Sequence, residues 1–170
     1  GTFRHVEVED LTKHKVDSEQ LIIPDDCVAR VNQAKTEKKK IISVGCTPLR
    51  AMETSVSTTS TLKPYQGWTN KFIFPKFKFR ISDALITNFH PPQSTLLMTT
   101  AAFGGKELIR EAYAEAIKEK YRLFAYGDAI LVKNPRAGVS PGSTNLLTMK
   151  KFLPLLLAML GFTLWPSNAS

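Results

Sequence analysis

The sequence has few of the residues that build disulfide frameworks or metal centres. It contains two cysteines and three histidines among 170 residues. Cys27 and Cys46 are too few for a disulfide framework or a cysteine-based zinc site, which favours a reducing compartment. The sequence therefore predicts a cytoplasmic protein without a metal centre.

Acidic residues are missing from the end of the chain, where Asp128 is the last one. The formal net charge is +8, and half of it comes from four basic residues after position 132, namely Lys133, Arg136, Lys150 and Lys151. The remainder of the chain is only mildly basic. An excess of positive charge is a weak indication of a polyanionic partner, either nucleic acid or a membrane surface.

Long apolar runs are also scarce. The run at 152–165 is shorter than the roughly 20 residues of a comfortable membrane-spanning helix, so a membrane location is not expected. Met149 opens a signal-peptide-like pattern at the wrong end of the chain for a signal peptide. It is either a weak membrane-binding segment or translated sequence of a neighbouring reading frame, and we favour the second. We predict a linker at 133–148 and a tail at 149–170 outside the fold.

The rest of the chain alternates strand-like and helix-like segments. Such alternation predicts a single α/β domain with a mostly parallel sheet flanked by helices. Expected strands cover 18–23, 41–44, 71–80, 84–87 and the two halves of 121–132; the helices follow Pro24 and Gly45 and cover 94–104 and 106–120. The apolar segment 41–44 is typical of a buried parallel strand.

Two strand-to-helix junctions carry the polar groups of interest. In the first, Thr87, Asn88 and His90 precede Ser94, a predicted helix N-cap. In the second, Gly45 ends a strand and Thr47 is the predicted N-cap. Open α/β sheets bind ligands at such junctions. For the first junction, a simple turn with a packed histidine is the alternative, and position alone slightly favours it.

The segment 71–80 alternates phenylalanine with basic residues and is interrupted by Pro75. Such alternation could stack on nucleic acid bases. The alternative, which we favour, is an edge strand protected by lysine and proline.

Six segments, in order, resemble the S-adenosylmethionine:tRNA ribosyltransferase-isomerases of queuosine biosynthesis. They read GTFRHV, HKVDSE, VGCTPLRAMET, GWTNKFIFP, LITNFHPPQSTLLM and YRLFAYGDAILV. The resemblance covers 1–132 and corresponds to the C-terminal part of that family's core domain. The family's inserted β-barrel domain has no counterpart, and the chain reads as though it begins inside a larger protein.

The resemblance implies a transferase-isomerase that acts on tRNA. Its reaction moves and isomerises the ribosyl part of S-adenosylmethionine onto 7-aminomethyl-7-deazaguanine at the wobble position, which yields epoxyqueuosine, adenine and methionine. S-adenosylmethionine is then a co-substrate, and no true cofactor or metal is implied. The expected enzyme is a monomer.

Site residues also follow from the resemblance. His90 is the candidate general acid and base, because imidazole titrates near working pH; Glu19 is the second catalytic candidate and could hold a ribose diol or the amine. Thr87 and Asn88 would orient ribose or base edges. The remaining candidates would bind phosphate, carboxylate or other substrate groups: Gly1, Thr2, Phe3, Ser18, Gly45, Thr47, Arg50, Ser94, Thr95 and Asp128.

The sequence departs from the family pattern at Asp17, where histidine is usual, and at Cys46, Pro48 and Pro91. These departures keep open the alternative of an inactive truncated fragment that at most binds RNA. The tail keeps open a further alternative, a membrane-associated protein.

Overall fold

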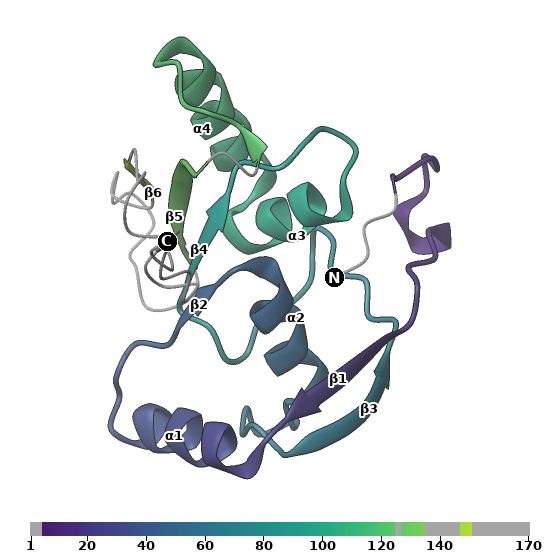
Figure 1. The fold of residues 1–170 in the computed structure, drawn as a ribbon, viewed down its shortest axis with the longest axis vertical. Coiled ribbons are helices and arrows are strands. Elements are labelled where there is room, and N and C mark those ends of the chain that lie inside the picture. The colour runs from purple at the N-terminus through teal and green to yellow at the C-terminus, as the bar shows by residue number, and fades with distance from the viewer. Residues whose placement is uncertain (1–4, 125–126, 135–146, 151–170) are drawn as a thin grey trace, which may run out of the picture.

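The computed structural model describes residues 5–124, 127–134 and 147–150, and these form an α/β fold (Figure 1). Gly1, Thr2 and Phe3 lie outside the described residues. The elements in chain order are the 3-10 helix Leu11–Lys13, β1 Glu19–Ile23, α1 Asp25–Thr36, β2 Ile42–Val44, α2 Cys46–Ser55, β3 Tyr65–Thr69, β4 Ala84–Asn88, α3 Thr95–Gly104, α4 Lys106–Lys118, β5 Ala129–Lys133 and β6 Leu147–Lys150.

The main sheet has the strand order β2-β4-β5-β6. Only β2 and β4 are parallel, whereas β4 with β5 and β5 with β6 are antiparallel. The prediction of a mostly parallel sheet is therefore wrong for the described part of the chain. The reason is the connection after β4: two helices, α3 and α4, return the chain to the end of the sheet that it left, so Asn88 pairs with Ala129.

One face of this sheet packs on helices and holds the larger core. Leu85, Ile130 and Val132 of the sheet are buried there with Phe89 and with Phe103 of α3. Figure 1 shows α2 and α3 beside the strands of this sheet. The other face of the edge strand β2 is open, since Ile42 is 51% and Val44 is 45% exposed. The expected parallel strand exists, but the prediction that it is buried on both faces is wrong.

A second, smaller unit joins β1 and β3 to α1. The two strands pair antiparallel, with Leu21 opposite Gly67. A cluster of buried apolar side chains from α1 and its surroundings, Ile23, Val28, Ile41, Leu62 and Ile81, fixes this unit beside the main sheet. The helix begins directly after Pro24 with two acidic residues, as the sequence predicts.

The helical pair α3–α4 is confirmed. The Ser94 hydroxyl caps α3 by accepting a hydrogen bond from the Leu97 amide, 3.1 Å away. Gly105 has φ 93°, a conformation that favours glycine, and it separates the two helices. Helix α4 buries Ile109, Ala112 and Ala116 on one stripe.

Two expected strands do not form. In segment 71–80, Pro75 and Lys76 make a turn, with Lys76 at φ 83° and the Phe77 amide donating to the Phe74 carbonyl at 3.1 Å, as in a type II turn. The segment 121–124 also forms no strand, because Arg122 is held by Asp128 instead (see below).

The division of the chain into domain, linker and tail stays a prediction. Strand β6 includes the last two residues of the predicted linker and the first two of the predicted tail. The residues that would decide the rest of that division lie outside the described ones.

Candidate functional site

The carboxyl ends of β2 and β4 lie side by side and lead into α2 and α3. The Gly45 amide donates to the Ile86 carbonyl at 2.7 Å, which joins the two junctions. A cavity of about 430 Å³ opens beside them. It brings together six of the predicted site residues: Gly45, Thr47, Thr87, Asn88, His90 and Ser94.

Gly45 shapes the start of α2. Its φ of 96° lies in the region that side-chain-bearing residues avoid, so glycine is needed there. The helix begins at Cys46 with Gly45 as its N-cap and without a side-chain cap. Thr47 is therefore not the cap, and this prediction was wrong by two residues. The exposed Thr47 instead lines the cavity at a helix N-terminus, where the dipole favours anionic groups.

His90 belongs to a small polar network. Its Nε2 lies 2.7 Å from the Thr87 hydroxyl and 3.6 Å from the Cys46 sulfur. The His90 amide donates to the Tyr113 hydroxyl oxygen at 2.7 Å. Burial lowers the pKa of His90 to about 4, so the imidazole is uncharged at neutral pH. The expectation that it titrates near working pH does not hold for this structure, although an uncharged imidazole can still accept a proton.

Cys46 is buried at the centre of the same network. Its sulfur lies 3.5 Å from the Thr87 hydroxyl and 3.8 Å from the Thr100 hydroxyl. Burial raises the pKa of the thiol, so it stays protonated, and a protonated thiol is a poor nucleophile. Cys46 thus acts as a packing and hydrogen-bonding group within the network.

Arg50 and Glu19 form an ion pair, and each side chain is 18% exposed. Burial lowers the pKa of Arg50. Two smaller cavities, of about 30 and 90 Å³, adjoin this pair. Thr47 lines both and also the large cavity, so the three hollows form one group along α2.

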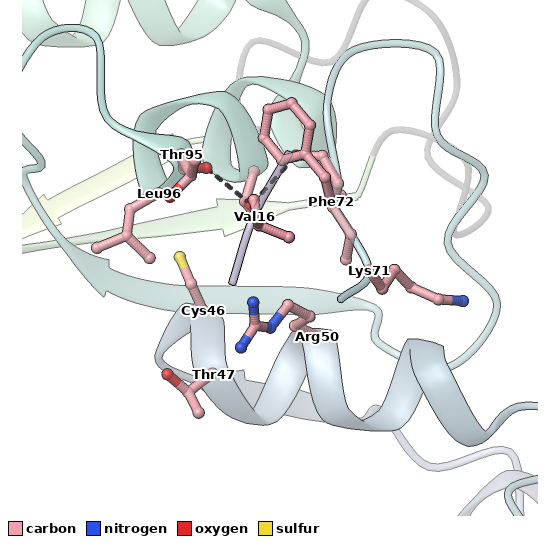
Figure 2. A pocket seen from close by; sticks show the side chains of 10 residues that line it. Val16, Cys46, Thr47, Arg50, Lys71, Phe72, Thr95 and Leu96 are labelled. Carbon is pink, nitrogen blue, oxygen red and sulfur yellow. Dashed lines mark hydrogen bonds between the residues drawn. The ribbon is translucent and has the colours of Figure 1, made fainter. Parts of the chain in front are cut away.

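Figure 2 shows the smallest of the three hollows, the one of about 30 Å³. The guanidinium of Arg50 reaches into it from α2, and Cys46, at the start of the same helix, lies between Arg50 and Leu96 in this view. Lys71, Phe72 and Val16 close it from neighbouring segments, and Thr95 also lines it.

Some predicted site residues have structural partners instead. Asp128 is 1% exposed and accepts from the Arg122 amide at 2.5 Å and from its guanidinium at 2.9 Å. The Asn88 amide group donates to the Asp128 carbonyl at 3.1 Å. Asp128 and the exposed Ser18 line none of the three hollows. Asp128 therefore orders the loop before β5.

Tyr113 and Phe124 are among the residues at the site that the sequence analysis did not predict. Tyr113 lies on the apolar stripe of α4. Its hydroxyl, a polar group on a buried face, was the sequence feature that could have indicated a polar contact such as the one with the His90 amide. Phe124 lines the large cavity, and its amide donates to the Phe89 carbonyl at 2.7 Å. No local pattern indicates that contact, because the two residues lie far apart in the sequence.

A family model described as "queuosine biosynthesis protein" matches residues 1–132. The chain belongs to this family. The match includes every residue predicted for the site, and the resemblance noted in the sequence is thereby confirmed.

Named relatives agree with this assignment. The chain is 58% identical over 132 residues to an S-adenosylmethionine:tRNA ribosyltransferase-isomerase of Flavobacterium psychrophilum and 57% identical to one of Parabacteroides distasonis. In each case 78% of this chain covers 38% of the relative. The chain thus spans well under half the length of these relatives.

A solved structure shares the fold. The crystal structure of S-adenosylmethionine tRNA ribosyltransferase from Thermotoga maritima matches with a TM-score of 0.59 and 43% sequence identity. The match covers 65% of this chain and 39% of the other. The α/β assignment of the core is thereby supported.

Within residues 5–124, 127–134 and 147–150, no three His, Cys, Asp or Glu side chains are grouped so that they could hold a metal ion. No helix of this part is both long and apolar enough to cross a membrane.

Proposed function

We propose that the chain contributes the substrate site of an S-adenosylmethionine:tRNA ribosyltransferase-isomerase. The reaction transfers and isomerises the ribosyl part of S-adenosylmethionine onto 7-aminomethyl-7-deazaguanine in tRNA, and releases adenine and methionine. The observation that carries the proposal is the family match over 1–132, which contains all the residues around the three hollows.

The Arg50–Glu19 pair suits the methionyl end of S-adenosylmethionine. That end is a zwitterion, with a carboxylate and an ammonium group. Arg50 would bind the carboxylate with a charge-assisted hydrogen bond, and Glu19 would accept from the ammonium group or from the ribose diol. The N-terminus of α2, beside Thr47, supplies a further partial positive charge for the carboxylate.

His90 is the proposed proton acceptor. The reaction needs a base that removes the acidic proton beside the sulfonium. The uncharged imidazole at the cavity wall can accept that proton, while Thr87, 2.7 Å away, holds the ring in place. Phosphate groups of bound RNA would raise the pKa of His90 and make it a stronger base.

The large cavity has room for the remaining groups. Thr87 and Asn88 would orient ribose or base edges, and Ser94 and Thr95 stand at the start of α3, where an anion is favoured. Within this proposal S-adenosylmethionine is consumed as a co-substrate, the chain has no resident cofactor, and the protein acts as a cytoplasmic monomer on tRNA.

The test is adenine release by the purified chain, given S-adenosylmethionine and tRNA that carries the aminomethyl base. We expect release by the wild-type chain and a loss of at least about 100-fold in His90→Ala, as for other acid-base groups. Lys118→Ala is the control, because Lys118 lies on the exposed face of α4 and lines none of the three hollows. Absence of release from a folded wild-type chain would favour the inactive-fragment alternative.

A further inference from the structure

A further hollow lies at the opposite end of strands β2 and β4 from the three hollows of the candidate site. It measures about 360 Å³, and its lining includes Lys35, Lys38, Lys39, Lys40 and Arg80. Lys40 precedes β2, and Asp83, which also lines the hollow, precedes β4. The hollow is therefore at the amino ends of the two strands whose carboxyl ends carry the substrate cavity.

Positive charge exceeds negative charge around this hollow. Five cationic side chains line it. Three carboxylates neighbour them: Lys39 pairs with Glu37, Lys40 lies 3.8 Å from Asp83, and Glu53 accepts from the Arg80 amide and attracts Lys35. The Lys35 ammonium donates to the Arg80 carbonyl at 2.7 Å, which ties the end of α1 to this neighbouring segment. The cations outnumber these carboxylates by two.

Helix capping explains only part of this cluster. Cations at the C-terminus of a helix are stabilised by its dipole, but that effect is confined to the last turn. Lys35 lies in the last turn of α1, whereas Lys39, Lys40 and Arg80 lie outside the helix. The basic side chains outside the helix therefore need another explanation.

We infer that this hollow binds the phosphate backbone of the RNA substrate; the inference rests on the proposed function. Lysine binds phosphate as a point charge, and such contacts do not depend on the base sequence of the nucleic acid. Strand β4 has five residues and spans about 17 Å. One RNA molecule with its target base in the substrate cavity can thus place other phosphates at this cluster.

The test measures the salt dependence of RNA binding. A fluorescently labelled RNA hairpin with an anticodon-loop sequence is titrated by anisotropy at several KCl concentrations. The variant is Lys38→Gln/Lys39→Gln. The matched control is Lys118→Gln/Lys120→Gln, since Lys38 and Lys120 share a positive φ after a helix, and Lys39 and Lys118 each pair with a glutamate.

We expect the cluster variant to bind several-fold more weakly and the slope of log K against log salt to fall by about 1.5, because two phosphate contacts are lost. The control should keep the wild-type slope. Equal slopes in the two variants, or no RNA binding by the folded wild-type chain, would overturn the inference. Adenine release is measured separately. If the wild-type chain binds RNA through the lysine cluster but releases no adenine, only the proposed function is refuted.

Discussion

Acid should destabilise the fold through His90. The folded-state pKa of His90 is about 4, against an ordinary value of 6.5. Between these values the unfolded chain binds more protons than the folded chain, so the free energy of unfolding falls as the pH drops. At 1.36 kcal/mol per pKa unit, the loss is about 2 kcal/mol at pH 5 and approaches about 3 kcal/mol at pH 4.

Urea unfolding from pH 7.5 to pH 4.5 measures this loss. The comparison is with His90→Gln, which keeps a polar side chain but does not titrate. Burial raises the pKa of Glu53, so its protonation increases the free energy of unfolding as the pH falls, opposite to His90. Both proteins contain Glu53, so its effect cancels when their free energies of unfolding are subtracted. We expect that difference to shrink by about 2 kcal/mol as the pH falls to 5. Parallel curves for the two proteins would refute the assignment of a buried, uncharged imidazole.

Two further predictions concern stability alone and are measured by the same unfolding experiment at pH 7.5. Glu53 is 1% exposed and accepts hydrogen bonds at 3.0 Å from the amides of Arg80 and Ile81; Glu53→Ala should cost about 3 kcal/mol, because it leaves both amides unpaired, and Glu53→Gln should cost less. A loss below about 1 kcal/mol would show that water replaces the carboxylate. A Cβ on Gly104 would lie 2.5 Å from Val132 Cγ1, so Gly104→Ala should cost about 1 to 3 kcal/mol, and an unchanged midpoint would contradict that close packing.

Local signals predicted most of the helices. The first turn of α1 has two acidic residues, α3 has Ser94 as its cap, and α4 has a clear apolar stripe. Each of these features depends on residues within one or two turns, so the sequence displays it directly. The position of the candidate site was predicted for the same reason: Gly45 and Thr87 stand at strand ends that precede helices.

Contacts between distant residues were not predictable in the same way. The antiparallel pairing of β4 and β5 depends on how α3 and α4 turn back, which no local pattern encodes. The Cys46–His90 contact joins residues 44 positions apart. The low pKa of His90 follows from burial, and burial is decided by these distant contacts. Asp128 is a further example: its local sequence is typical of an exposed turn, but the side chain is buried and pairs with Arg122.

The most direct test of the central claim is where S-adenosylmethionine binds. Amide chemical shifts of the isotope-labelled chain are recorded by NMR as S-adenosylmethionine is added. The account predicts that the largest changes fall in 45–50 and 87–95, around the three hollows, while the amides of 38–40, before the amino end of β2, stay unchanged. Saturable changes centred anywhere else, or none at all in a folded chain, would contradict it.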